Sequence, residues 1–181
     1  MRTLVTGGAG FVGSNPVKRV LYQGHPPTVW DNFSTGKREN LPADHPYLQV
    51  VETDVNDPPY GHPQFDVIFH LAALARIQPS FLHPTTTFDS NVSGTLRILE
   101  MARSVNARVV YAGSSSFYYD RYINPYTFTK WVGEEICTMY SRVYKVSTAT
   151  ARFFNVYGPN HIRFGPYSTV LGVFERQYQA G

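Results

Sequence analysis

The sequence predicts an α/β protein built on a doubly wound parallel sheet. Short apolar runs bounded by turn residues alternate with longer segments of helical periodicity. This alternation favours a parallel sheet that helices cover on both faces. A glycine-rich turn at residues 6–13 directly follows the first apolar run, and polar residues follow several later runs. Ligands of such sheets bind at the carboxyl ends of the strands, where the strand order reverses.

The apolar runs and the helical patterns place the individual elements. Strands are expected at residues 4–6, 28–30, 48–52, 65–71, 108–112 and 147–152. One helix is expected to begin near Pro84, because proline suits the first helical turn, and to run to about residue 102. Another is expected over residues 126–144. The first helix is expected near Phe11, and Pro16 inside it predicts a kink or a delayed start.

Length and composition favour a single cytoplasmic domain. The 181 residues suffice for one core, the single cysteine cannot form an internal disulfide, and no apolar run reaches membrane-spanning length. Residues 1–90 hold 6 Lys and Arg against 8 Asp and Glu (net −2), whereas residues 91–181 hold 10 against 5 (net +5). The basic half either meets an anionic ligand such as a nucleotide diphosphate or is ordinary surface charge. The basic residues are scattered along the sequence, which argues against a nucleic-acid-binding surface. The histidines lack the spacing of metal ligands.

The glycine turn is typical of a site for a dinucleotide pyrophosphate. Gly7 allows a tight turn, Gly10 allows backbone N–H groups to approach phosphate oxygens, and Gly13 allows close packing of strand and helix. The helix that follows offers unpaired N–H groups and the positive end of its dipole to the anion.

An acidic residue at the end of the second expected strand indicates which dinucleotide binds. Asp31 lies about 20 residues past the turn, where a carboxylate can accept hydrogen bonds from the adenosine ribose. Its charge would repel a 2′-phosphate, which favours NAD over NADP, although Lys37 and Arg38 nearby oppose that preference. The alternative is that Asp31 is a turn residue before Asn32.

A tyrosine and a lysine four residues apart suggest acid–base chemistry. Tyr126 and Lys130 would share one face of the expected helix, and a positive charge near a phenol lowers its pKa. Ser114 ends a strand in a cluster of hydroxyls that would reach the same crevice. A hydroxyl, a phenol and an ammonium beside NAD form a centre that can oxidise an alcohol. In that arrangement Lys130 also bonds the nicotinamide ribose.

Four other residues could carry chemistry or only support the fold. His70 ends a strand, where a packed or hydrogen-bonded role is favoured over catalysis, and Cys137 is expected in the core. Arg76 and Arg163 either meet a diphosphate or are solvated loop arginines.

Taken together, the motifs resemble the NAD-dependent epimerase/dehydratase family of extended short-chain dehydrogenases/reductases, and within it the UDP-glucose 4-epimerase-like nucleotide-sugar epimerases. The resemblance extends over nearly the whole chain and implies a Rossmann-type fold. The matching segments are residues 6–13, 31–36, 70–73, 91–95, 114–116, 126–130 and 152–158.

The resemblance assigns roles position by position. The implied catalytic residues are Ser114, Tyr126 and Lys130. The implied NAD-binding residues are Gly7, Gly10, Phe11, Val12, Asp31, Asn32, Ser34, Thr35, Gly36, Asp54, Val55, Leu71, Ala72, Ala73, Asn91, Tyr126, Lys130 and Phe153. The implied residues for a nucleotide-diphosphate sugar are Ser114, Ser115 and Asn155. No metal site is implied.

The hydroxyl triplet Ser114-Ser115-Ser116 bears on the reaction. Family dehydratases resemble Thr-Asp-Glu at this place, and decarboxylating members resemble a triplet that ends in Glu. A triplet without a carboxylate favours epimerisation, most simply at C4 of a UDP-sugar through a transient keto-sugar. The alternatives are a related reductase or dehydratase, or a non-catalytic NAD-binding relative or fragment.

The sequence departs from the family pattern near the hydroxyl triplet. Tyr119 stands where the family usually has glycine, and the stretch from Ser114 to Tyr126 is shorter than in the familiar 4-epimerases.

Residues 1–155 are expected to bind NAD, and residues 156–181 to begin an incomplete substrate lobe. The resemblance implies a homodimer formed by the helices at 91–105 and 126–144. The residues expected to supply an apolar patch there, unless they are core, are Trp131, Ile136, Met139 and Val143.

Overall fold

The strands of this protein form one parallel sheet in the order β3-β2-β1-β4-β5-β6, as seen in a computed structural model that describes residues 1–59, 61 and 63–180. The strands are β1 (Thr3–Thr6), β2 (Pro27–Asp31), β3 (Gln49–Glu52), β4 (Val67–His70), β5 (Arg108–Ser114) and β6 (Thr148–Phe153). The order reverses between β1 and β4, which defines a doubly wound sheet of the Rossmann type. The predicted fold class is confirmed.

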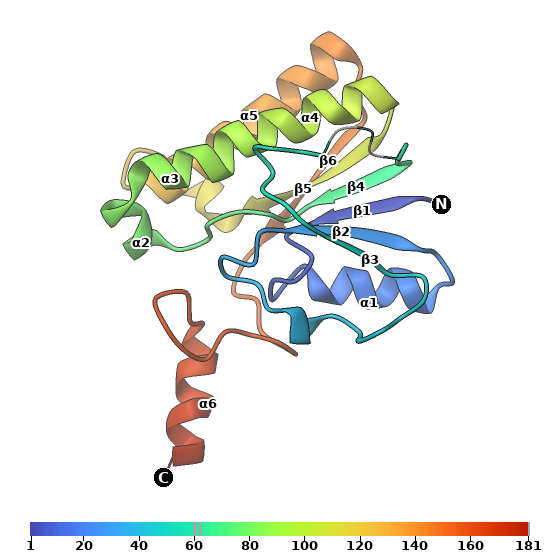
Figure 1. Ribbon diagram of the computed structural model, residues 1–181. Helices are drawn as coiled ribbons and strands as arrows, with labels where there is room; N and C mark the ends of the chain where they lie inside the picture. Colours follow the sequence, from blue (N-terminus) through green and yellow to red (C-terminus); the bar gives the residue numbers. More distant parts are fainter. Residues whose placement is uncertain (60, 62, 181) are drawn as a thin grey trace.

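Helices pack on the two faces of this sheet (Figure 1). The α3, α4 and α5 helices lie over one face, and α1 lies under the other. The helices are α1 (Ser14–Tyr22), α2 (Ile77–Leu82), α3 (Pro84–Phe88), α4 (Gly94–Val105), α5 (Pro125–Tyr144) and α6 (Val170–Ala180). Coverage is incomplete at β6, where Ala149 and Thr150 are exposed, so the expectation of two covered faces holds for the inner strands.

Strand β1, inside the sheet, shows why apolar residues occur at successive positions in the sequence. Leu4 and Val5 are adjacent in β1 and point to opposite faces, because side chains alternate along a strand. Leu4 joins the core cluster that includes Ile68 and Leu99, whereas Val5 joins the cluster that includes Val17. A strand buried on both faces needs apolar residues at successive positions.

The first helix begins later than its glycine turn. It begins at Ser14, which places Pro16 third in the helix. The first four N–H groups of a helix have no partner within it, so proline sacrifices no hydrogen bond there. The delayed start is confirmed.

The long helical region after Pro84 is broken by a π-helical turn. The helix begins at Pro84 as predicted, but Asp89–Ser93 form the π-helical turn between α3 and α4. A single uninterrupted α-helix to residue 102 was therefore wrong. Such turns re-aim side chains and often occur at functional sites.

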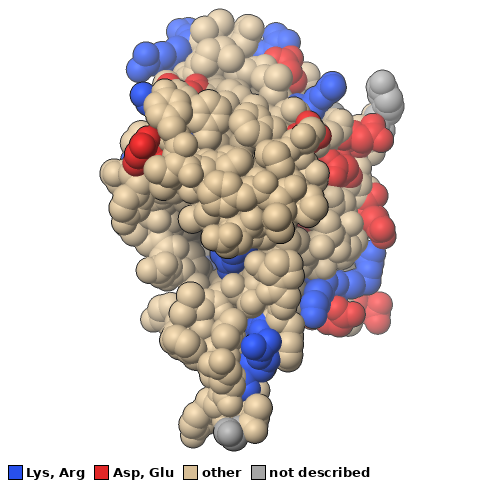
Figure 2. All heavy atoms as spheres, turned by 90° about the vertical axis from the view of Figure 1, so that its left-hand side faces the viewer, with Lys and Arg blue, Asp and Glu red and all other residues tan. Residues whose placement is uncertain are grey.

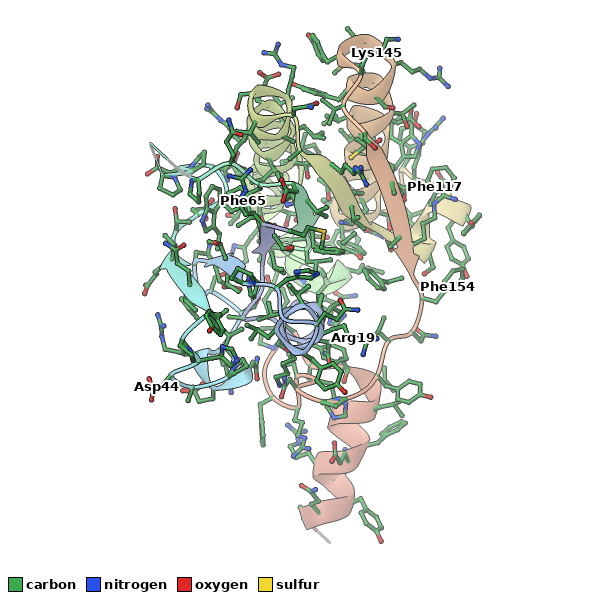
Figure 3. The ribbon with its side chains drawn as sticks, turned by 90° about the vertical axis from the view of Figure 1, so that its right-hand side faces the viewer. Arg19, Asp44, Phe65, Phe117, Lys145 and Phe154 are labelled. Atoms are coloured by element: carbon green, nitrogen blue, oxygen red, sulfur yellow. The ribbon has the colours of Figure 1, made fainter. Side chains whose placement is uncertain are left out.

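The chain after β6 crosses back to the glycine turn. Figure 3 shows Phe154 where the chain leaves the sheet. Farther on, the Asn160 amide donates to Ser14 Oγ at 2.9 Å, and the His161 ring packs edge-on to Phe11. The α6 helix then projects away from the sheet (Figure 1). The domain division at residue 155 stays a prediction.

Across the described residues, no helix is long and apolar enough to cross a membrane.

Candidate active site

A cavity of about 750 Å³ opens at the carboxyl ends of the strands, where the strand order reverses. Residues from the glycine turn, the ends of β2, β4 and β5, α5 and the segment after β6 line it. The predicted site residues that line it are Gly7, Gly10, Phe11, Val12, Asp31, Asn32, Ser34, Thr35, Asp54, Val55, Leu71, Ala72, Ala73, Ser114, Ser115, Tyr126, Lys130 and Phe153. Gly36, Asn91 and Asn155 are not among the lining residues.

The glycine turn has the geometry that the sequence predicts. Gly7 has a φ of +67°, which favours glycine, and its N–H donates to the Trp30 carbonyl at 2.7 Å. A Cβ at Gly7 would lie 2.7 Å from the Ala72 nitrogen, so only glycine lets the two loops meet. Within the described residues, the N–H groups of Phe11 and Val12 donate to no protein acceptor, which leaves them for an anion.

Asp31 has a structural role in addition to its place in the cavity. Its carboxylate accepts hydrogen bonds from the N–H groups of Ala9 at 2.9 Å and Phe33 at 2.8 Å. Burial raises the pKa of Asp31, and these two backbone hydrogen bonds oppose that effect. The alternative of a turn residue is thus correct for one oxygen. The contact with an adenosine ribose stays a prediction.

Neighbouring polar side chains extend this rim. The Asn32 amide donates to the Asp54 carboxylate at 2.7 Å, and Ser34 Oγ donates to Asn32 Oδ1 at 2.7 Å. Gly36 lies behind this rim, where a Cβ would lie 3.0 Å from the Asp31 carboxylate. Glycine at this position allows this close packing, and a contact between Gly36 and the cofactor stays a prediction.

The phenol and the hydroxyl cluster meet at the end of β5. Tyr126 Oη donates to Ser114 Oγ at 3.3 Å, and Ser114 Oγ also accepts from Ser116 Oγ at 2.9 Å and from the Ser116 N–H at 3.2 Å. A hydroxyl oxygen accepts at most two hydrogen bonds, so these contacts are shared and Ser114 can also donate its own proton to Tyr126 Oη or Ser116 Oγ. The sequence-based pairing of Ser114 with Tyr126 is present in the structure.

Lys130 lies one turn along α5 from Tyr126, with 5% of its surface exposed. Its ammonium lies 4.4 Å from the centre of the Tyr111 ring. Burial lowers the pKa of Lys130 to about 8, while Cys137 and Glu134 on the same helix act in the opposite direction. Cys137 is buried in the core as expected. The effect of Lys130 on the phenol stays a prediction.

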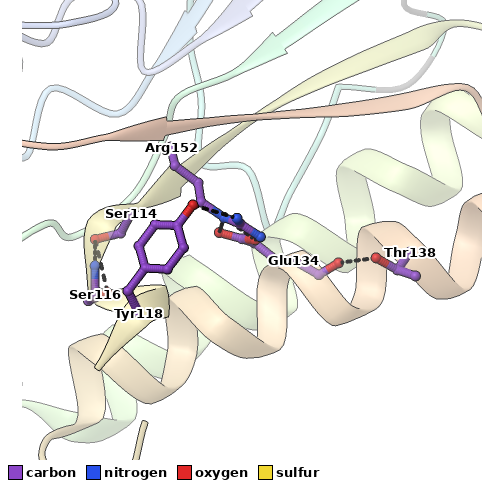
Figure 4. A network of polar contacts seen from close by, with 6 residues as sticks. All are labelled: Ser114, Ser116, Tyr118, Glu134, Thr138 and Arg152. Carbon is purple, nitrogen blue, oxygen red and sulfur yellow. Dashed lines mark hydrogen bonds and ion pairs between the residues drawn. The ribbon is translucent and has the colours of Figure 1, made fainter. Parts of the chain in front are cut away.

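Arg152 holds the hydroxyl turn against α5, a role that the sequence analysis did not assign (Figure 4). Its guanidinium donates to Glu134 Oε2 at 2.9 Å and 3.0 Å and to Tyr118 Oη at 3.0 Å. It also lies 3.6 Å from the centre of the Phe117 ring. These contacts fix the 3-10 turn Ser115–Tyr118, which directly follows Ser114.

Asn91 acts behind the wall of the cavity. Its Oδ1 accepts from the Leu74 N–H at 2.8 Å, and its Nδ2 donates to the Leu74 carbonyl at 3.2 Å and to Thr129 Oγ1 at 3.0 Å. These partners fit a conformational role for Asn91, and a contact between Asn91 and the cofactor stays a prediction. Asn155 is exposed outside the cavity, so the structure does not bring this predicted substrate residue to the site.

His70 is packed and hydrogen-bonded, as predicted. Thr95 Oγ1 donates to the Asn91 carbonyl at 2.7 Å and lies 3.0 Å from His70 Nε2, so that nitrogen carries the ring proton. Nδ1 then accepts from Thr6 Oγ1 at 2.8 Å. Burial, followed by the charge of Lys130, lowers the pKa of His70 to about 3, so the ring is neutral.

The structure places Arg76 and Arg163 in different surroundings. Arg163 pairs with Glu175 at 2.8 Å outside the cavity, whereas Arg76 lines the cavity. Cavity-lining residues that the sequence analysis missed include Tyr167 and Thr169 of the segment after β6. No short-range pattern indicated them. No group of three or more His, Cys, Asp or Glu side chains suited to a metal ion occurs in the described part of the chain.

The family model described as the NAD dependent epimerase/dehydratase family matches residues 3–179. The chain belongs to this family. The fold and the recognised motifs are therefore those of an extended short-chain dehydrogenase/reductase.

Relatives in this family fall into two activity groups. UDP-glucuronic acid decarboxylase 1 of Xenopus tropicalis is 34% identical over 177 residues, covering 87% of this chain and 42% of the relative. A putative UDP-glucose 4-epimerase of Methanocaldococcus jannaschii is 32% identical over 173 residues, covering 86% and 56%. The chain spans about half the length of these curated relatives.

Among solved structures, a UDP-N-acetylglucosamine 4-epimerase from Methanobrevibacter ruminantium M1, solved in complex with UDP-N-acetylmuramic acid, has a TM-score of 0.94 and 28% identity. The match covers 99% of this chain and 63% of that one.

Proposed function

We propose that this protein is an NAD-dependent epimerase that inverts C4 of a UDP-sugar through a transient 4-keto-sugar. One observation carries the proposal. The Ser114 hydroxyl meets the phenol of Tyr126 and the Ser116 hydroxyl, and no carboxylate from the described residues lines this part of the cavity. The acidic residues lining the cavity are Asp31, which bonds the glycine turn, and Asp54, which bonds Asn32.

The glycine turn supports NAD as the cofactor. The free N–H groups of Phe11 and Val12 suit a pyrophosphate, and the buried carboxylate of Asp31 favours a ribose that carries no 2′-phosphate. NAD, when bound, supplies a hydride acceptor. We propose that residues 1–155 hold it and that residues 156–181 begin the substrate lobe, since Tyr167 and Thr169 line the same cavity.

The protein's own groups manage the proton. In its phenolate form, Tyr126 Oη accepts the proton of the C4 hydroxyl as hydride leaves C4, and it returns that proton when the keto group is reduced on the other face. Ser114, which contacts Tyr126 Oη, orients the sugar oxygen through its hydroxyl group. The Lys130 ammonium would donate to the nicotinamide ribose when NAD is bound, and its charge would stabilise negative charge on Tyr126 Oη.

The position of Ser116 favours epimerisation over decarboxylation. Decarboxylating members, to judge by the resemblance, have Glu at the end of the triplet, and here Ser116 bonds the Ser114 hydroxyl instead. A hydroxyl supplies no base beside the sugar. The second candidate is decarboxylation, which is favoured by the 34% identity to a UDP-glucuronic acid decarboxylase.

Product analysis tests the proposal. NAD-loaded protein is incubated separately with UDP-glucose, UDP-galactose and UDP-glucuronate, and the products are separated and weighed. Interconversion of C4 epimers with unchanged mass is expected. Release of CO2 from UDP-glucuronate, without epimerisation of any sugar, would establish the second candidate instead. The Ser116→Glu variant serves as the matched probe of the triplet.

A further inference from the structure

Arg76 places a positive charge in the cavity without an acidic partner. Its Nε donates to the Tyr167 carbonyl at 3.1 Å, and its Nη1 donates to the Ala75 carbonyl at 3.1 Å. Carbonyls orient the guanidinium but do not neutralise it. Within residues 1–59, 61 and 63–180, no Asp or Glu forms an ion pair with Arg76.

Arg76 lines the same cavity as Ser114 and Tyr126. It directly precedes α2, and Ser80 on that helix accepts a hydrogen bond from the Tyr126 N–H at 3.1 Å, which ties the two segments together. Burial lowers the pKa of Arg76, and the charge of a Tyr126 phenolate acts against that shift. Figure 2 shows Lys or Arg atoms set in the hollow above the C-terminal segment, surrounded there by uncharged residues.

The shape of a hexose tells which group this charge can reach. Tyr126 would contact the oxygen on C4, and the substituent C6 is carried by C5, the adjacent ring carbon. The diphosphate on C1 lies across the ring. A guanidinium in the same cavity as the phenol can therefore reach the group at C6. A carboxylate pairs with a guanidinium through two parallel hydrogen bonds.

We propose that Arg76 binds the C6 carboxylate of the substrate and so selects UDP-hexuronates over neutral UDP-hexoses. The proposal rests on the proposed C4 chemistry and names the substrate class for it. The ligand carboxylate supplies the missing counter-charge, which offsets the cost of holding an unpaired cation in the cavity.

The same contact opposes decarboxylation. Oxidation at C4 turns a hexuronate into a β-keto acid, which loses CO2 when the C5–C6 bond breaks and its electron pair moves to the C4 oxygen. The carboxylate loses its negative charge in that step. A guanidinium that binds the charged carboxylate stabilises the ground state more than the transition state and slows the loss. We therefore expect a C4 epimer that retains its carboxylate.

The experiment compares two sugars and three arginine variants. NAD-loaded wild type, Arg76→Gln, Arg76→Lys and Arg163→Gln are assayed for affinity by calorimetry and for kcat and KM with UDP-glucuronate and UDP-glucose. Arg163 is the matched control, because its charge is paired with Glu175 outside the cavity. Arg76→Gln is expected to weaken UDP-glucuronate by about 10- to 100-fold, the size of a lost charged hydrogen-bonding pair. UDP-glucose should change little, and Arg76→Lys should lie between.

The outcomes separate this proposal from the proposed function. Wild-type protein that binds UDP-glucuronate no more tightly than UDP-glucose overturns the role of Arg76, whether or not epimerisation occurs. An equal loss for both sugars in Arg76→Gln also overturns it, because Arg76 then only holds Tyr167. Binding of UDP-glucuronate that depends on Arg76 without turnover of either sugar keeps the carboxylate site and refutes the 4-epimerase.

Discussion

Glu134 on α5 receives the Arg152 guanidinium from β6 through hydrogen bonds of 2.9 Å and 3.0 Å to one carboxylate oxygen. The Glu134 side chain is only 6% exposed, and Arg152 is its ion-pair partner. Arg152 also reaches Tyr118, so the pair joins α5, β6 and the turn that positions Ser114. The relationship links the stability of the sheet edge to the geometry of the site.

Breaking this pair should destabilise the protein. Arg152→Gln leaves the Glu134 charge buried without its counter-charge, and we expect a loss of about 3 kcal/mol in the free energy of unfolding. Urea denaturation measures it. Arg103→Gln is the control, because the Arg103–Glu100 pair is about half exposed and should contribute less than about 1 kcal/mol. Equal effects of the two substitutions would show that the buried pair has no special role.

Tyr126→Phe should abolish turnover while NAD stays bound. Loss of a general acid–base group costs about 100- to 10,000-fold in kcat. Ser114→Ala should cost less, because Ser114 orients the oxygen. Turnover and NAD affinity are measured side by side, with Tyr122→Phe as the control, since Tyr122 is exposed and does not line the cavity. Near-normal epimerisation by Tyr126→Phe would transfer the proton role to another group.

The lowered pKa of Lys130 predicts an alkaline limit. The ammonium is charged below about pH 8 and loses its charge as the pH rises through that value. Turnover and NAD affinity should therefore both fall above pH 8. Lys130→Ala should reduce turnover and NAD affinity at every pH and should remove the fall above pH 8 from their pH profiles. A fall that persists in the variant would belong to a different group.

His70 should make the fold sensitive to acid. Its pKa is about 3 in the folded protein, against about 6.5 in an unfolded chain. As the pH falls below 6.5, the unfolded chain binds a proton that the folded protein refuses, so stability falls by about 2 kcal/mol at pH 5. Unfolding at pH 7.5 and pH 5 should show a smaller difference for His70→Gln. The exposed His83, changed to Gln, should leave the difference as in the wild type.

Asp31→Ala should change both cofactor choice and stability. The substitution leaves the N–H groups of Ala9 and Phe33 without their acceptor, which costs about 1–3 kcal/mol. It should also weaken NAD and relax the preference over NADP. Titration with the two cofactors measures the preference, and Asp31→Asn retains an acceptor while removing the charge. Equal affinity of the wild type for NAD and NADP would refute the ribose contact.

The predicted homodimer is tested through α5. Met139 and Val143 are 40% and 60% exposed, whereas Ile136 packs against the core and Trp131 is half-buried. The exposed pair remains as a candidate apolar contact. Light scattering at micromolar concentration should report a dimer, and Val143→Glu should yield a monomer. Val170→Glu on α6 is the control. A monomeric wild type would count against the dimer.

Local sequence patterns predicted the fold and many of the residues that line the cavity. Strand positions followed from apolar runs, because a strand buried on both faces needs them, although β4 proved shorter than expected and Phe65 lies in the core outside it. The glycine turn, Asp31 and the Tyr126–Lys130 spacing act over short distances along the chain. Such features can be read without knowing how distant segments meet.

By itself, the sequence determined the doubly wound sheet, the glycine turn and the helix face that carries the phenol and ammonium. Only the tertiary structure decided that Asn91 and Gly36 lie behind the cavity wall, that Arg152 pairs with Glu134, and that Arg76 enters the cavity with no carboxylate partner among the described residues. Each of these depends on side chains from segments far apart in the chain. Their contacts are fixed by how the helices pack on the sheet, which periodicity and spacing do not encode.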